Sequence, residues 1–226
     1  MDYSSEILKK FLNLYWVRPE TAFWRTLDVL QMKSVEFKKP ILDIGCGDGS
    51  FSFTNFGGSV DYTFDVYRTI KNTSGFFEGV DIHNQNKLIK PKIIKKVEQQ
   101  IDVGLDWKKN LLTKANQFNT YEKLIHHDSN KKLPFKDGTF ETIFSNTFYW
   151  LNSIENILNE SKRVSTKNGK IIIFVPDKKF KDSLIYNKFI KNEYEWAKIL
   201  DRGIYNNTKH CYTLSKWKSI FSKADL

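Results

Sequence analysis

The sequence predicts an α/β protein built on a doubly wound, mostly parallel sheet with helices on both faces. From residue 101 onward, short apolar runs alternate with helical patterns. A first apolar run at 40–44 leads directly into a glycine-rich turn, and the last run, at 170–175, is apolar without alternation. Such a run is typical of a strand covered on both faces, and parallel strands need crossover helices between them.

The individual elements follow from local signals. Ser4 or Ser5 is positioned to cap a helix over 6–16, and Pro19 stands where a first helical turn tolerates proline, before a helix over 20–31. These two helices form a predicted N-terminal cover over 1–35. Asn152, with Glu155 three residues later, resembles a capping box. The remaining elements are predicted as strands over 40–44, 101–105, 123–126, 140–145 and 170–175, and as helices over 107–118 and 152–164.

The composition indicates one globular domain. The chain has 226 residues, of which 40% are hydrophobic and 15% aromatic, enough for one large α/β core. It shows no secretory signal and no apolar run of membrane-spanning length, and its two cysteines, Cys46 and Cys211, do not suffice for a disulfide framework or a zinc site. We therefore expect a cytoplasmic domain over 1–226, with an insertion over 51–100 and a helical, substrate-side segment over 178–226.

The net charge of +10 raises the question of a nucleic-acid partner. The excess is mainly lysine, and most of it follows residue 150. Nucleic-acid sites favour arginine, whose planar fork matches phosphate and guanine edges, and the chain has few arginines. The charge therefore predicts a solvated lysine surface, with nucleic acid as the less favoured partner.

The glycine-rich turn is the strongest candidate for a ligand site. Gly45, Gly47 and Gly49 follow the first strand directly, and ligands of open α/β sheets bind at the carboxyl ends of strands. The G-x-G-x-G spacing differs from the G-x-G-x-x-G of dinucleotide sites. Asp43 and Asp48 flank the turn, which is unfavourable beside a pyrophosphate but suits a cationic ligand. Two further acids, Asp106 and Asp128, follow the next two predicted strands.

Together these segments resemble class I S-adenosylmethionine-dependent methyltransferases, most closely the methyltransferase-11 type. Residues 41–49 look like the family's motif I, and 103–106 like its second strand, whose closing acid holds the ribose hydroxyls. Residues 127–129 with 133–135 resemble the segment that contacts adenine, 136–146 the fourth strand, with Glu141 where aspartate is usual, and 161–175 the approach to strand five.

The resemblance implies a Rossmann-like fold, S-adenosyl-L-methionine as cofactor and S-adenosyl-L-homocysteine as product. It implies methyl transfer by in-line displacement to a small or medium-sized acceptor, with no metal. The implied cofactor-binding residues are Asp43, Gly45, Cys46, Gly47, Asp48, Gly49, Asp106, Trp107, Asp128, Ser129 and Asn146. The catalytic residue stays unknown, with His210, Tyr149 and Trp150 as candidates and His126 and His127 as further titratable groups.

Several residues have a second interpretation. Asp48 could cap a helix, and Cys46 could be a small packing residue. Asp81 also follows a strand-like run, but we favour Asp106 because a clean helix follows it and Asp128 comes 22 residues later.

The aromatic segments also have two interpretations. The phenylalanine-rich insertion over 51–100 is either a packed accessory lobe or a lid and acceptor wall. The aromatics Tyr15, Trp16 and Trp24, with Arg18, form part of the helical cover, and we expect them in the core rather than at a binding site.

The function also has alternatives: methylation of RNA or protein, or a non-catalytic protein with a methyltransferase-like fold. Residues 212–226 read as the helix that precedes the family's final antiparallel hairpin, which is missing from the sequence. The apolar run 171–175 would then be a sheet edge that needs cover from 178–226 or from a second subunit, so we expect a monomer or homodimer.

Overall fold

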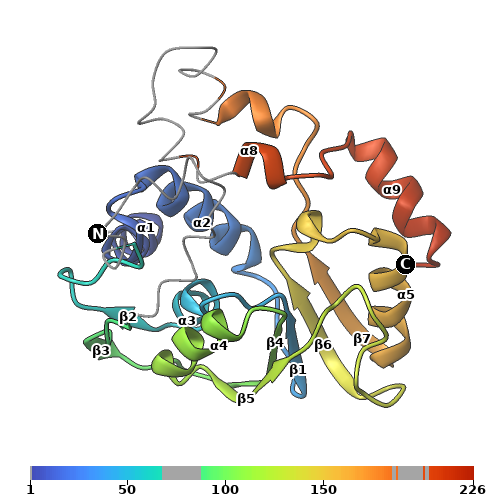
Figure 1. Ribbon diagram of the computed structural model, residues 1–226, viewed down its shortest axis with the longest axis horizontal. Helices are drawn as coiled ribbons and strands as arrows, with labels where there is room; N and C mark the ends of the chain where they lie inside the picture. Colours follow the sequence, from blue (N-terminus) through green and yellow to red (C-terminus); the bar gives the residue numbers. More distant parts are fainter. Residues whose placement is uncertain (1, 68–87, 185–186, 188–200, 202–203) are drawn as a thin grey trace.

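A five-stranded, all-parallel sheet forms the centre of the molecule. The computed structural model describes residues 2–67, 88–184, 187, 201 and 204–226. Strand order is β5-β4-β1-β6-β7, so β1 lies in the middle (Figure 1). The strands are β1 (Ile41–Ile44), β4 (Ile101–Asp106), β5 (Tyr121–His126), β6 (Phe140–Ser145) and β7 (Ser165–Ile173). The predicted doubly wound α/β fold is confirmed.

A small antiparallel pair lies beside this sheet. It consists of β2 (Ser59–Val60) and β3 (Ile93–Lys95), which precede β4 in the chain. Among the described residues that follow β7, none adds a strand to the main sheet, and the nearest approach is an isolated bridge between Asp177 and Tyr212. Within the described residues, the antiparallel pair is therefore β2–β3, and β7 forms one edge of the main sheet.

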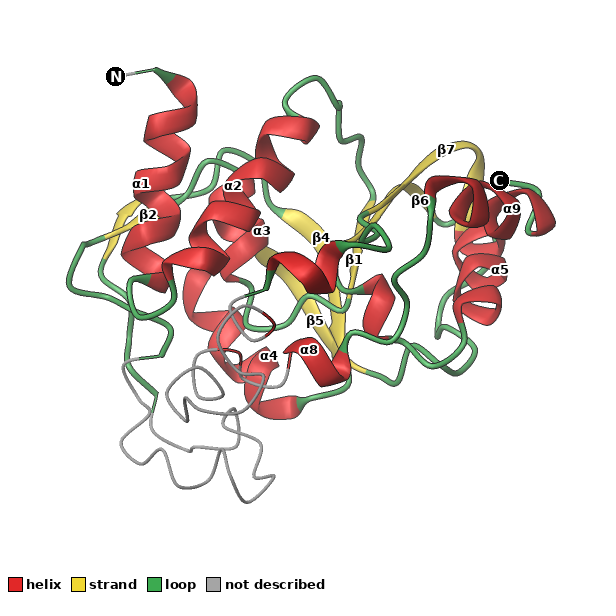
Figure 2. Ribbon diagram, turned by 90° about the horizontal axis from the view of Figure 1, so that it is seen from above, coloured by secondary structure: helices red, strands yellow, loops and turns green. Residues whose placement is uncertain are grey.

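Helices cover both faces of the main sheet. In Figure 2 helices α1 to α3 lie on one side of the strands, and α5 and α9 lie on the other. The helices are α1 (Tyr3–Tyr15), α2 (Pro19–Met32), α3 (Ser50–Asn55), α4 (Lys109–Ala115), α5 (Ile154–Val164), α8 (Ile204–Asn207) and α9 (Leu214–Lys223), with short 3-10 turns η3 (Asn116–Phe118), η4 (Phe148–Trp150) and η5 (Phe180–Ser183). None of the described helices combines the length and apolar character of a membrane span.

Alternation along the strands divides the core between the two faces. Leu42 and Ile44 of β1 pack with α5 and with Trp217 of α9. Phe144 of β6 faces the other way, where it joins Phe11 of α1 and Phe51 of α3. Because successive side chains of a strand point to opposite faces, a continuous apolar strand serves both cores.

The N-terminus of α1 differs from the sequence prediction. Asp2 Oδ1 accepts two hydrogen bonds, one from the backbone N–H of Ser5 at 2.8 Å and one from the hydroxyl of Ser4 at 2.8 Å. The helix therefore begins at Tyr3, and the prediction of Ser4 or Ser5 as the cap was wrong, because the aspartate three residues earlier reaches the free N–H groups of the first turn.

The cap of α5 also differs. Ser153 Oγ accepts from Asn156 N at 3.4 Å, so the cap is Ser153 and not Asn152. The Asn152 side-chain oxygen accepts from Lys209 Nζ instead, at 2.5 Å. The Asn152 side chain is thus bound by a residue distant in the sequence and does not cap the helix. Pro19, in contrast, begins α2 as predicted.

Candidate active site

The glycine turn after β1 is held tightly between two neighbouring segments. Gly45 N and Cys46 N donate to Leu105 O at 2.7 and 3.0 Å, which fixes the turn against the end of β4. Gly45 has φ +74°, and a Cβ there would lie 2.1 Å from Thr147 Oγ1, beyond the end of β6. Gly47 has φ +59° but no atom within 4 Å of such a Cβ. The turn therefore needs glycine for its backbone conformation, and it leaves open space at Gly47.

Asp106 ends β4 directly beside this turn. Its Oδ2 accepts from Gly47 N at 3.0 Å and its Oδ1 from Lys108 N at 2.8 Å. Burial to 6% exposure raises the pKa of this carboxyl, and the two backbone donors partly oppose the shift. Each carboxylate oxygen can accept a second hydrogen bond, so Asp106 can hold a pair of hydroxyls. The competing candidate, Asp81, lies outside the described residues.

Asp43 of β1 supports the turn from the interior. Its Oδ2 accepts from Ser52 Oγ at 2.5 Å and from Tyr121 OH at 2.7 Å, whereas its buried Oδ1 has no hydrogen-bond partner among the described residues. The side chain is 1% exposed, and this burial raises its pKa to about 6. Asp43 therefore links β1, α3 and β5 rather than lining an open space.

Because the pKa of Asp43 is raised, we expect the Asp43→Asn variant to gain stability relative to the parent as pH rises. Between pH ~4 and ~6 the folded protein holds a proton that the unfolded chain has released, so the unfolding free energy falls as pH rises through this window. Asparagine cannot ionise and can still accept from Ser52 and Tyr121. We expect the stability of the variant relative to the parent to increase by up to about 3 kcal/mol from pH 4 to pH 7, measured by urea unfolding.

The matched control for this prediction is Asp128→Asn. Two hydrogen bonds from Asn130 lower the pKa of Asp128, so its stabilising contribution is present at neutral pH and is lost on acidification. The unfolding free energy of Asp128→Asn relative to the parent should therefore change with pH in the opposite direction. An Asp43→Asn difference that is constant with pH would contradict the buried-carboxyl interpretation.

A second chain of hydrogen bonds joins the N-terminal helices to the turn. Tyr15 OH donates to Ser50 Oγ at 2.5 Å, because the Ser50 hydroxyl itself donates to Asp48 Oδ1 at 2.6 Å. Ser50 N also donates to Asp48 Oδ1, at 3.1 Å. Burial raises the pKa of Tyr15, so the phenol stays protonated. Asp48 thus restrains the first residue of α3 and is also part of the site.

A cavity of about 530 Å³ opens beside the turn, within the usual size range of ligand pockets. Its walls come from α2, from the turn, and from the segments that follow β6 and β7. Figure 1 shows α2 and α8 over this end of the sheet. The predicted site residues that line the cavity are Gly45, Cys46, Gly47, Asp48, Asn146, Tyr149 and Trp150. Tyr15, Arg18 and Trp24 also line it, although we expected the aromatics of the helical cover in the core rather than at a site. Trp16 is 70% exposed and belongs neither to the lining nor to the core.

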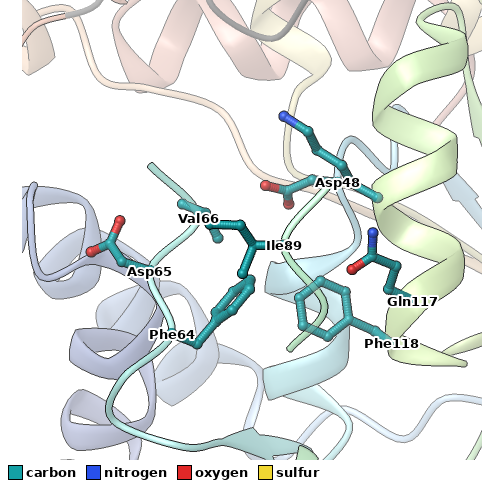
Figure 3. Close-up of a pocket in the computed structure, with 8 residues that line it drawn as sticks. Asp48, Phe64, Asp65, Val66, Ile89, Gln117 and Phe118 are labelled. Atoms are coloured by element: carbon teal, nitrogen blue, oxygen red, sulfur yellow. The ribbon is translucent and has the colours of Figure 1, made fainter. Parts of the chain in front are cut away.

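A much smaller pocket adjoins the cavity at Asp48. Figure 3 shows the Asp48 carboxylate near Phe64, Ile89 and Phe118. Its volume of about 30 Å³ has room for one or two water molecules. The larger cavity is therefore the candidate site for a ligand.

Other predicted site residues lie outside the cavity lining. These are Asp43, Gly49, Asp106, Trp107, Asp128, Ser129 and His210. Trp107 is 64% exposed beyond the end of β4, with Lys108 Nζ 5.2 Å from its ring centre. His126 Nε2 contacts Trp107 O at 2.7 Å, which brings the ends of β4 and β5 together. Trp107 and His126 therefore mark the ends of β4 and β5, outside the cavity lining.

His210 is held in a structural position. Its Nε2 donates to Leu151 O at 2.9 Å, and its Nδ1 lies 2.9 Å from Tyr212 OH. Because both ring nitrogens are engaged and the residue does not line the cavity, the structure does not favour the predicted role as a base. His127, whose Nε2 lies 3.0 Å from Lys132 O, is likewise outside the lining.

The sequence analysis missed the polar part of the cavity wall. Arg25 Nη1 donates to Asp28 Oδ2 at 3.1 Å, and the guanidinium lies 5.1 Å from the ring centre of Phe51. Burial raises the pKa of the Tyr149 hydroxyl, and the charge of Arg25 partly opposes that shift. The available signal was the i, i+3 spacing of opposite charges on one helix face. That spacing does not reveal which face of the helix meets a cavity.

With this geometry established, the chain can be compared with known proteins. Residues 94–173 match the methyltransferase domain family of type 11. No curated protein matches the chain in sequence. The matched segment and the parallel sheet are consistent with the class I S-adenosylmethionine-dependent methyltransferases that the sequence resembles.

Three solved structures illustrate the likeness. A SAM-dependent methyltransferase of Thermotoga maritima is 14% identical, with 98% of this chain and 76% of that chain covered and a TM-score of 0.55. A protein solved with the Trm112 methyltransferase activator of Haloferax volcanii is 14% identical, with 99% and 76% covered and a TM-score of 0.51. The YcgJ protein of Bacillus subtilis is 16% identical, with a TM-score of 0.48; 86% of this chain is covered, and the chain spans only 65% of that protein.

Proposed function

We propose that the protein is an S-adenosylmethionine-dependent methyltransferase that acts on a small or medium-sized acceptor. The observation that carries the proposal is the meeting of the glycine turn, the strand-end carboxylate of Asp106 and the cavity of about 530 Å³ at one edge of the sheet. A cavity of this size accommodates small molecules.

The chain's own groups fit the cofactor. Asp106 keeps acceptor capacity on both carboxylate oxygens for the ribose hydroxyls, and the open space at Gly47 permits close approach to the backbone. The acidic surroundings formed by Asp43, Asp48 and Asp106 suit a sulfonium cation. When bound, the cofactor supplies a methyl group activated by that sulfonium for in-line displacement.

The protein's contribution is mainly to position the acceptor. Burial raises the pKa of the Tyr149 hydroxyl, so at neutral pH this group is a hydrogen-bond donor and not a base. Aromatic side chains, among them Trp24, Trp150 and Phe180, line the cavity around it. We therefore propose that Tyr149 orients the acceptor, since holding two reactants in line supplies a large share of the rate in such reactions.

Titration calorimetry with S-adenosylmethionine, S-adenosylhomocysteine and NAD tests the proposal. We expect micromolar binding of the first two ligands and none of NAD, because the acids at the turn oppose a pyrophosphate. Turnover is then measured with labelled methyl donor and candidate acceptors. Binding of NAD alone, or of none of the three, would contradict the assignment.

A further inference from the structure

The part of the cavity away from the glycine turn has an aromatic wall. Trp24 of α2 and Phe180 of η5 pack edge to face, with ring centres 5.8 Å apart. Tyr149 of η4 lies 6.5 Å from Phe180 and 5.8 Å from Trp150. All four side chains line the cavity. Rings from three segments distant in the sequence therefore form a surface that suits a planar ligand.

A polar group lies against this wall. Arg25 and Asp28, with side chains 19% and 22% exposed, form an ion pair at the cavity surface. Burial raises the pKa of the nearby Tyr149 hydroxyl, a shift that the charge of Arg25 partly opposes. A guanidinium has five N–H groups, so donors remain beside the bond to Asp28, and the Tyr149 O–H is a further donor that faces the cavity. Asp28 supplies a carboxylate acceptor beside these donors.

The ionised groups around the cavity balance one another. The described lining contains three basic and three acidic side chains, namely Arg18, Arg25, Lys179, Asp28, Asp48 and Asp177. An anionic ligand at Arg25 would meet the charge of Asp28, and a cationic ligand at Asp28 would meet the charge of Arg25. Neither charge sign is favoured at this end of the cavity.

We infer that the acceptor is a neutral aromatic compound that carries a hydroxyl group, held by the Arg25–Asp28–Tyr149 cluster with its ring against Trp24 and Phe180. This inference rests on the proposed function and names its substrate class. A hydroxyl both donates and accepts, so it matches a site that presents a carboxylate beside N–H and O–H donors. A flat ring matches the aromatic wall.

Four probes of similar size test the inference by calorimetry on protein saturated with S-adenosylhomocysteine. They are 2-naphthol, 2-naphthoate, 2-naphthylmethylammonium and the saturated alcohol 2-decalol. We expect 2-naphthol to bind at least about tenfold more tightly than each of the others. Equal or tighter binding of the anion or the cation would overturn the neutral-ligand inference, and equal binding of 2-decalol would overturn the aromatic one. An absence of 2-naphthol binding would overturn both.

Variants locate the site. Tyr149→Phe and the double variant Arg25→Gln/Asp28→Asn should each weaken 2-naphthol binding by about tenfold and leave S-adenosylhomocysteine binding within about twofold. The double variant avoids leaving one buried charge alone. Its matched control is Lys162→Gln/Asp225→Asn, which removes a surface ion pair of 3.1 Å outside the cavity and should change neither affinity.

Failure of this inference is distinguishable from failure of the proposed function. Unchanged 2-naphthol affinity in both cluster variants would overturn the inference while leaving the cofactor assignment intact. Absence of S-adenosylhomocysteine binding would refute the proposed function. In that case the four probes are titrated into the protein without S-adenosylhomocysteine. The same order of affinities supports the aromatic hydroxyl site, and any other order overturns it.

Discussion

Replacing Asp106 by alanine is expected to weaken S-adenosylhomocysteine binding by at least about 100-fold. The carboxylate fixes Gly47 N and Lys108 N at 3.0 and 2.8 Å, and it is the proposed acceptor for two ribose hydroxyls. A hydrogen bond to a charged group contributes about 1.5–3 kcal/mol, and about 1.4 kcal/mol corresponds to a factor of ten in affinity. Loss of two such bonds therefore gives at least the stated effect, measured by calorimetry.

Two variants separate cofactor contacts from general damage to β4. Asp106→Asn keeps one carbonyl acceptor, so its loss in affinity should be intermediate. Asp102→Asn lies on the same strand and retains an acceptor for Ile41 N, which donates to the Asp102 carboxylate at 2.7 Å at the end of β4 away from the turn. We expect its affinity to equal that of the parent. Undiminished binding by a folded Asp106→Ala protein would refute the assignment of this carboxylate.

Truncating Phe144 to alanine is expected to lower the unfolding free energy by about 3–5 kcal/mol. Phe144 of β6 is fully buried at 0% exposure. Its ring stacks on Phe51 at 5.8 Å and meets Phe37 and Phe174 edge to face at 6.0 and 6.2 Å. The ring thus joins β6 to α3 and to the segment after β7, and its removal leaves a cavity that these neighbours fill only in part.

The matched control is Phe23→Ala on α2. Its side chain is 52% exposed, so we expect a cost below about 1 kcal/mol. Urea unfolding of the two variants and the parent gives both values from the transition midpoints and slopes. Equal costs for the two phenylalanines would show that the face of the sheet covered by α1 to α3 is not a packed core.

The strands were the most predictable part of the fold. The interval 140–145 was predicted with the observed bounds, and 40–44 and 101–105 were each within one residue. The last strand was predicted at 170–175 but begins at Ser165, because Phe140 pairs with Ser165 ahead of a register shift. Strand pairing, which decides such an extension, involves a partner distant in the sequence.

The sequence by itself determined the order of strands and helices, the glycine turn and the acids at the strand ends. These features depend on residues that are neighbours in the chain: apolar runs, positive-φ glycines and an acid that directly follows a strand. For the same reason, Asp106 was correctly placed at the end of a strand that pairs with β1.

Only the tertiary structure decided which side chains share the cavity. Arg25, Tyr149 and Phe180 come from α2, η4 and η5, and no local pattern shows that these segments meet. The engagement of both His210 nitrogens and the loss of Asn152 as a cap likewise depend on contacts between distant segments. Helix periodicity identifies a buried face, but the packing of the whole chain determines whether that face meets a core or a ligand cavity.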